Sequence, residues 1–267
     1  MRIPTGSLAL FRRRGRLLLG VVLGVVAMPG LAFDQQASLQ AAQTTASSHS
    51  ACTALASFYW EIGDRKGVLV SGSRGGALAP RATTQLPIYS AGKWLDAAYV
   101  FQLRNGQLKA GDVRALTLSA GYLADGRCPL ATTVAACHKT LSQFDQAAVG
   151  RFKYGPGHLQ KHVAVDLGQG ALNAKQLGTQ IVSNLGGALA LSYDQPHLGG
   201  GARSSAAEYA VFLRRILNGP LLLGALGTHA VCTNTAPDDP ATGRKHCPTA
   251  LYSPTSDRAA GLMEDWT

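Results

Sequence analysis

The chain has 267 residues, 46% of them hydrophobic and 15% charged, and its formal net charge is +10 at neutral pH. This length and apolar content suffice for one large hydrophobic core. Five of the 25 Lys and Arg residues, and none of the 15 Asp and Glu residues, lie in positions 1–32, so loss of that segment would leave a charge of +5. So mildly basic a surface, without a Lys/Arg block or interleaved aromatic residues, argues against a nucleic-acid partner.

Residues 1–32 have the pattern of a secretory signal peptide. Four clustered arginines at 12–14 and 16 directly precede an apolar run from Leu17 to Ala27, and the small residues Gly30 and Ala32 follow. This order predicts export with cleavage after Ala32, and therefore a periplasmic or secreted protein. The alternative is an uncleaved N-terminal anchor, which would be the chain's only link to a membrane, although the apolar run is short for a bilayer span.

Residues 33–50 contain Gln, Ala, Ser and Thr with little pattern, and predict a flexible segment ahead of a single domain at 51–267. Two β-prone runs, 58–62 and 68–72, flank a turn-rich linker and predict a hairpin. No internal repeat or linker divides the remainder.

Three stretches have apolar residues at helical spacing and predict helices over 89–101, 173–186 and 205–218. Asn173 is the expected N-cap of the second helix. The third is the clearest, because Ser205 and Glu208 form a capping-box pattern and Gly219-Pro220 follows its end.

Ser90-Ala91-Gly92-Lys93 is the candidate catalytic motif. Residues i and i+3 at the start of a helix share one face, so the Lys93 amine can reach the Ser90 hydroxyl. A desolvated, partly neutral lysine can accept the serine proton, and the Ser90 backbone N–H can contribute to an oxyanion hole. The alternative is a plain helix start, with Ser90 as the N-cap and Lys93 in solvent.

Four of the five cysteines form two closely spaced pairs. Cys128 and Cys137 bracket a turn-like stretch, and Cys232 and Cys247 bracket a polar loop. In an exported chain, each pair is predicted to close as a local disulfide. Cys52 is left over, and the alternatives for it are a buried free thiol, a bond between chains, or a partner beyond the end of this sequence.

A zinc site is the competing interpretation of the cysteines, because His138 and His246 adjoin two of them. The chain has no Cys-x-x-Cys pair, so disulfides are favoured and no metal is predicted.

Two separated stretches resemble the β-lactamase and penicillin-binding-protein superfamily of serine hydrolases. Residues 86–94, LPIYSAGKW, look like the nucleophile segment, and residues 198–209, LGGGARSSAAEY, look like the glycine-rich turn and the helix after it. The resemblance implies an α/β (α+β) fold in which helices flank an antiparallel sheet and a helical region carries Ser90. It makes Gly200 and Gly201 candidate substrate-binding residues.

The second motif of that superfamily, Tyr-x-Asn or Ser-x-Asn, is best matched by Tyr154-Gly155-Pro156. The resemblance gives Tyr154 the role of protonating the leaving group, whereas proline stands where asparagine is expected. His158 is the candidate to replace part of the missing amide's function in substrate binding. The alternative for Tyr154 is a buried aromatic whose hydroxyl is satisfied.

His158 and His162 have the i, i+4 spacing of metal-binding pairs. The Glu of His-Glu-x-x-His is absent, so a non-ligand role is predicted for both.

The third motif, Lys or His-x-Gly on an edge strand, has no match between Gly219 and Thr267. The resemblance therefore leads us to expect that the sequence ends early, through truncation or divergence, and that one wall of the cleft is not supplied in the family's usual way.

These features together predict an exported serine hydrolase that acts through an acyl-enzyme on an ester, an amide, a D-Ala-D-Ala-type peptide or a β-lactam, without a cofactor. Its partner would be a small-molecule or peptide substrate, and departures from strict β-lactamase motifs favour an esterase or peptidase. Two alternatives remain: an inactive relative that binds a cell-wall peptide or a protein, and a structural domain with a coincidental match. The sequence does not determine the oligomeric state.

Overall fold

The computed structural model describes residues 35–187 and 189–223, and in the C-terminal part residues 229, 231–233, 237–241, 245–247 and 250–252. The predicted signal peptide lies outside these residues. No helix in the described part of the chain is both long enough and apolar enough to cross a bilayer.

The N-terminal elements lie beside a two-stranded hairpin. α1 (Gln35–Ser48) has no buried residue, and the short α2 (Ser50–Thr53) follows it. A helix replaces the irregular structure expected for 33–50, because Ala and Gln favour helix even without a buried face. The flexibility of this segment remains a prediction.

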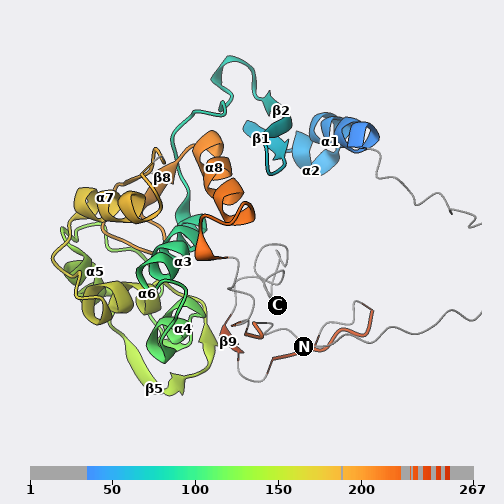
Figure 1. The fold of residues 1–267 in the computed structure, drawn as a ribbon. Helices are drawn as coiled ribbons and strands as arrows, with labels where there is room; N and C mark the ends of the chain where they lie inside the picture. The colour runs from blue at the N-terminus through green and yellow to red at the C-terminus, as the bar shows by residue number, and fades with distance from the viewer. Residues whose placement is uncertain are drawn as a thin grey trace, which may run out of the picture.

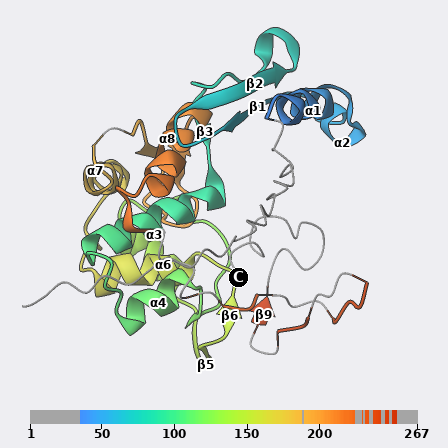
Figure 2. The same cartoon turned by 45° about the vertical axis from the view of Figure 1, so that its right-hand side comes forward.

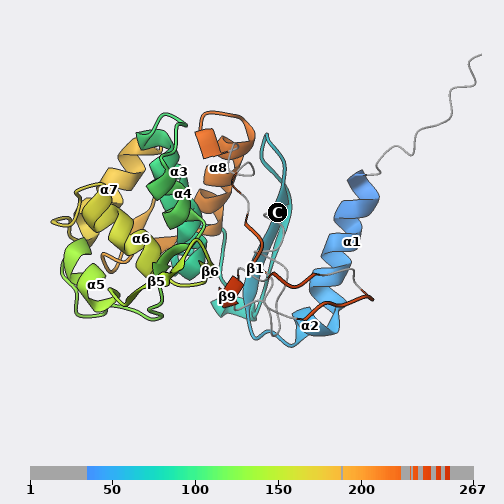
Figure 3. The ribbon, with the colours of Figure 1, turned by 90° about the horizontal axis from the view of Figure 1, so that it is seen from below.

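The predicted hairpin is confirmed as β1 (Phe58–Gly63) and β2 (Val68–Arg74), which are antiparallel with Phe58 opposite Arg74. The Asp64 carboxylate fixes the turn by accepting hydrogen bonds from the N–H groups of Lys66 and Gly67 at 2.7 and 2.9 Å. The hairpin lies between α1 and the helical body, with β1 next to α8 (Figures 1 and 3).

The helical body is built around α3 (Gly92–Leu103), whose residues 95–101 are all buried. Around it lie α4 (Ala110–Leu116), α5 (Val134–Thr140), α6 (Gly157–Lys161), α7 (Ala174–Asn184) and α8 (Ala206–Leu217) (Figure 1). The π-helical turn η3 (His162–Asp166) continues α6, and 3₁₀ turns occupy η1 (Gly76–Leu78) and η2 (Tyr89–Ala91). One main core cluster joins α3, α6, α7 and α8.

Two predicted helices are confirmed with their caps. The Asn173 side chain accepts a hydrogen bond from the Gln176 N–H at 2.9 Å at the start of α7. The Ser205 hydroxyl accepts one from the Glu208 N–H at 3.3 Å at the start of α8. The Glu208 carboxylate does not close the capping box, and instead accepts a hydrogen bond from the Ala190 N–H.

The predicted mixture of helices and antiparallel strands is confirmed, but in the described residues the strands form several small sheets in place of one antiparallel sheet. The remaining strands are β3 (Leu86–Pro87), β4 (Ala120–Tyr122), β5 (Phe144–Val149), β6 (Phe152–Lys153), β7 (Ser192–Tyr193), β8 (Ala202–Ser204) and β9 (Ala250–Tyr252). With the hairpin they form four small sheets, β1-β2, β3-β8-β7, β4-β5 and β6-β9. The last pair is parallel, and Figure 2 shows β6 beside β9. Strands of two or three residues are too short to extend into a continuous sheet.

Both predicted disulfides are present in the structure. Cys128 bonds Cys137, joining the loop before α5 to α5 itself, and Cys232 bonds Cys247. These sulfur atoms are not thiolates, so the zinc interpretation of the two pairs is wrong. Cys52 is a free, partly buried thiol.

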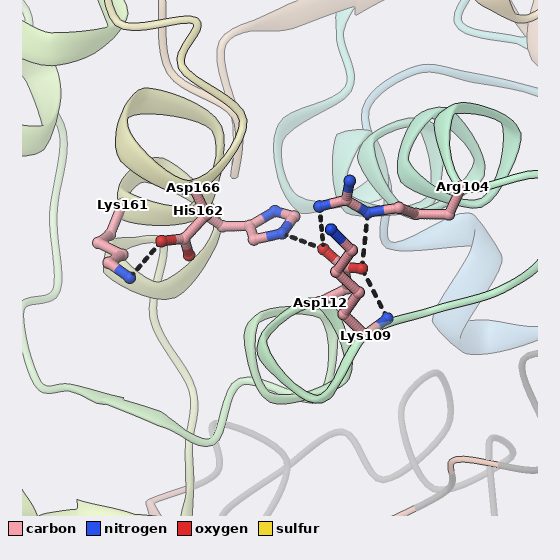
Figure 4. A network of polar contacts seen from close by, with 6 residues as sticks. All are labelled: Arg104, Lys109, Asp112, Lys161, His162 and Asp166. Carbon is pink, nitrogen blue, oxygen red and sulfur yellow. Dashed lines mark hydrogen bonds and ion pairs between the residues drawn. The ribbon is translucent and has the colours of Figure 1, made fainter.

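A buried ionic network ties α4 to two other parts of the body (Figure 4). Asp112 accepts two hydrogen bonds from the Arg104 guanidinium, at 2.7 and 2.9 Å, and one from the Lys109 N–H at 2.8 Å. His162 Nε2 lies 2.7 Å from the same carboxylate. The His162 side chain is therefore bonded to Asp112 within the core, in agreement with the non-ligand role predicted for it.

Candidate active site

The two stretches that resemble the serine hydrolases lie side by side. Strand β3 pairs with β8, with Leu86 opposite Ser204 and Pro87 opposite Arg203. The Ile88 N–H then donates to the Ala202 carbonyl at 3.0 Å. This pairing places the glycine-rich turn at 199–201 next to the segment that precedes Ser90, although more than a hundred residues separate the two in the sequence.

The backbone changes direction sharply just before Ser90. Tyr89 has a φ of +45°, in the left-handed region that residues with a Cβ rarely occupy. Such strain persists where the surrounding structure holds it, and it is frequent at functional sites. The turn leaves the Ser90 hydroxyl exposed at the surface of a cleft.

Ser90, Lys93 and Tyr154 form a triangle of polar atoms. Lys93 Nζ lies 3.0 Å from Ser90 Oγ and 3.3 Å from the Tyr154 hydroxyl oxygen. The Tyr154 hydroxyl donates to Ser90 Oγ at 2.6 Å. The structure thus brings together all three predicted catalytic residues. Ser90 lies in η2, the N-cap of α3 is Ala91 and Lys93 points into the cleft, so the plain helix-start alternative is wrong.

The Lys93 ammonium has a third hydrogen-bond acceptor that the sequence did not reveal. The Gly199 carbonyl accepts a bond from Nζ at 2.9 Å, and the amine also lies 4.7 Å from the centre of the Tyr154 ring. An ammonium group has three N–H donors, and here each has an acceptor. The Gly199 carbonyl therefore helps to orient Lys93, a function for which the sequence offered no amide at Pro156.

These residues line an open cleft of about 440 Å³. Its other wall comes from the loop before Cys128, where the Arg127 guanidinium lies 5.2 Å from the centre of the Tyr89 ring. Asp125, on the same loop, is bonded to Lys153 at 2.9 Å. On the opposite side Asp194 is bonded to Arg203 at 3.1 Å.

The predicted substrate-binding residues have different outcomes. Gly200 and Gly201 line the cleft. His158 does not line this cleft. Its Nδ1 accepts the Ala120 N–H at 3.0 Å, its Nε2 lies 2.9 Å from the Lys153 carbonyl, and burial lowers its pKa to about 4. The ring is a neutral structural bridge.

Gln160 is a buried residue that sequence reasoning missed. Its amide Nε2 donates to the carbonyls of Val134 and Pro196 at 3.0 and 2.8 Å, and its Oε1 accepts the Leu198 N–H at 3.0 Å. It thus holds the turn that presents Gly199 to Lys93. No local pattern marks it, because all three partners are distant in sequence.

Replacing Gly199 with alanine is expected to reduce the reactivity of Ser90 at least about tenfold, because an interaction that orients a catalytic group would be lost. A Cβ there would lie 2.8 Å from Pro156 Cβ and 3.5 Å from Lys93 Nζ, so the turn must shift and carry its carbonyl away from Lys93. The rate at which a fluorophosphonate labels Ser90 measures the effect.

Two further variants make the Gly199→Ala test specific. Gly199→Ala combined with Pro156→Gly removes the nearest clashing atom and should restore part of the labelling rate. Gly111→Ala, where a Cβ meets nothing within 4 Å, should leave it unchanged. Full reactivity in Gly199→Ala would show that this carbonyl does not orient Lys93.

No protein-family model and no curated protein matches the sequence. Among solved structures, the fold is similar to that of a candidate β-lactamase from Bacteroides dorei DSM 17855, with a TM-score of 0.43 and 19% sequence identity. The similarity covers 60% of this chain and 56% of that one, so the chain spans little more than half the length of that structure. At 19% sequence identity, the similarity describes only the path of the backbone.

Proposed function

We propose that the protein is a serine hydrolase that forms an acyl-enzyme on Ser90. One observation carries the proposal: a solvent-exposed serine hydroxyl lies 3.0 Å from a lysine amine and 2.6 Å from a tyrosine hydroxyl, in a cleft able to admit a small substrate. A nucleophile within hydrogen-bond reach of a base, with the base oriented by further groups, is the arrangement that nucleophilic catalysis requires.

In the proposed reaction, the Ser90 oxygen attacks the carbonyl carbon of an ester or amide. Its proton passes to the neutral form of Lys93, and the Tyr154 hydroxyl, bonded to both groups, donates a proton to the leaving alcohol or amine. The Ser90 N–H, before the first turn of α3, is available to the oxyanion. Water then hydrolyses the acyl-enzyme and restores the serine.

Substrates of this site are proposed to be esters or amides of small acyl groups. Tyr89, Pro87 and Ala202 offer apolar surface near Ser90, whereas Arg127 and Gln195 offer polar contacts. The site needs no metal for this chemistry, because Lys93 and Tyr154 supply the proton transfers.

We also propose that the protein is exported. The two disulfides support this location, since such bonds persist in the periplasm or outside the cell and are rare in the cytosol. The four arginines and the apolar run within residues 1–32 support it independently.

Mass spectrometry of the purified protein after treatment with a fluorophosphonate tests the nucleophile. We expect a single adduct on Ser90, absent from Ser90→Ala and retained in Ser142→Ala, which changes another exposed serine. No adduct on folded protein would contradict the proposal. It would favour instead an inactive relative that binds a cell-wall peptide or a protein.

A further inference from the structure

His197 lies in the same cleft as Ser90 and has no part in the acylation chemistry. It occupies the turn between β7 and β8, where its carbonyl accepts the Gly201 N–H at 2.8 Å. Its side chain is only 5% exposed, and Nε2 is buried without a hydrogen-bond partner. Leaving a buried polar atom unpaired is costly, so such a group calls for an explanation.

The surroundings of His197 keep it neutral and leave it free to accept a proton. Burial, followed by the charges of Lys93 and Arg127, lowers its pKa to about 4. One ring nitrogen lies within 4.8 Å of the sulfur atoms of Cys128 and Cys137. Because those sulfurs are bonded to each other, they do not bind a metal together with the ring.

Gly200 keeps a gap open between the imidazole and the nucleophile segment. A Cβ on Gly200 would lie 3.3 Å from both Nδ1 and Cε1 of His197, and 3.8 Å from the carbonyl carbon of Tyr89, the residue before Ser90. Any larger residue would fill this space. The Nδ1 side of the ring therefore faces the space at Gly200, next to the Tyr89 carbonyl carbon, in the solvent-open cleft that Ser90 also lines.

We infer that His197 is the general base that activates water for hydrolysis of the acyl group on Ser90, an inference that rests on the proposed function. The water oxygen bonds to the acyl carbonyl carbon while its proton passes to the imidazole. The bond between that carbon and Ser90 Oγ then breaks, and Oγ recovers a proton from Tyr154 or Lys93. The imidazolium gives its proton, through solvent, to whichever of Tyr154 and Lys93 lacks one, so all four side chains regain their starting states as the acid product leaves.

Burst kinetics with a p-nitrophenyl ester separates the two half-reactions. In His197→Gln we expect the first turnover, one p-nitrophenol per chain, to keep its rate and amplitude. The steady-state rate should fall about 100-fold or more, the usual contribution of a general base. Mass spectrometry should then show the acyl group accumulating on Ser90.

His138→Gln is the matched control, since His138 adjoins the same disulfide but does not line the cleft. It should keep both phases at their wild-type rates. Gly200→Ala is a second test that leaves the imidazole in place: a methyl group in the gap should slow both the steady-state rate and the loss of a preformed acyl group from Ser90, followed by mass spectrometry. This variant decides the question if His197→Gln does not fold.

The outcomes distinguish this inference from the proposed function. Absence of a fluorophosphonate adduct on Ser90 in the wild type overturns both. An adduct on Ser90 combined with an unchanged steady-state rate in His197→Gln and Gly200→Ala overturns only the role of His197. A parallel loss of burst and steady state in His197→Gln would also overturn it, as would a wild-type acyl-enzyme that water does not hydrolyse.

Discussion

Lys93→Met is expected to lower the second-order rate constant for fluorophosphonate labelling of Ser90 by about 10³-fold, the typical contribution of a positioned proton acceptor. Methionine is similar in length to lysine, but it removes the amine that lies 3.0 Å from Ser90 Oγ and 4.7 Å from the centre of the Tyr154 ring. The measurement is a time course of adduct formation by mass spectrometry at several reagent concentrations.

The control for Lys93→Met is Lys161→Met. Lys161 is bonded to Asp166 and does not line the cleft, so its loss should leave labelling unchanged. Thermal unfolding of both variants shows whether the fold is kept. Removal of a general base should slow labelling far more than about threefold. Labelling of folded Lys93→Met within that factor of the wild-type rate would therefore mean that another group takes the Ser90 proton.

Asp112→Ala is expected to reduce the free energy of unfolding by about 3–5 kcal/mol, the usual result of removing one partner from a buried ion pair. Asp112 is almost completely buried and receives hydrogen bonds from Arg104, Lys109 and His162 (Figure 4). Its loss would leave the His162 ring buried with neither nitrogen bonded, because Nδ1 already has no partner. Urea unfolding at pH 7 measures the change.

A surface pair in the same region provides the control. Lys161 and Asp166 are bonded at 2.6 Å, but about a third of each side chain is exposed. Asp166→Ala should therefore cost no more than about 1 kcal/mol. Equal losses in Asp112→Ala and Asp166→Ala would show that the buried network contributes nothing beyond an ordinary surface contact.

The Asp112 network also predicts acid sensitivity. Burial raises the pKa of the Asp112 carboxyl, but the hydrogen bonds from Arg104, the Lys109 N–H and His162 outweigh it and lower the pKa to about 2. In the unfolded chain the Asp112 carboxyl has a pKa of about 3.9. The contribution of its ionised form to the stability of the fold is therefore complete above that pH, and it is lost as the pH falls toward 2. In Asp112→Asn, unfolding measurements between pH 5 and 2 should show a shallower decline than the wild type.

Much of the secondary structure could be predicted from local signals. The β-prone runs at 58–62 and 68–72 formed the hairpin, and the caps Asn173 and Ser205 marked the starts of α7 and α8. Local signals do not reveal the elements within 107–153, because α4, α5 and the β4-β5 pair are short and owe their stability to packing. The single sheet expected from the family resemblance was likewise absent from the described residues.

The sequence by itself determined what short separations control. The i, i+3 spacing on a helical turn was enough to bring Lys93 to Ser90, and the eight residues between Cys128 and Cys137 allowed a disulfide to close. These contacts depend on the geometry of one turn or one loop, so they can be read from the order of the residues.

Only the tertiary structure decided which groups complete the site. Tyr154 lies 64 residues from Ser90 and Gly199 lies 106 residues from Lys93, yet both are within hydrogen-bond distance. The same packing took His158 out of the cleft and put His197 into it. A carbonyl oxygen or an unpaired imidazole leaves no periodic pattern in a sequence, because its position depends on how α3, α6 and the β3-β8 pair pack together.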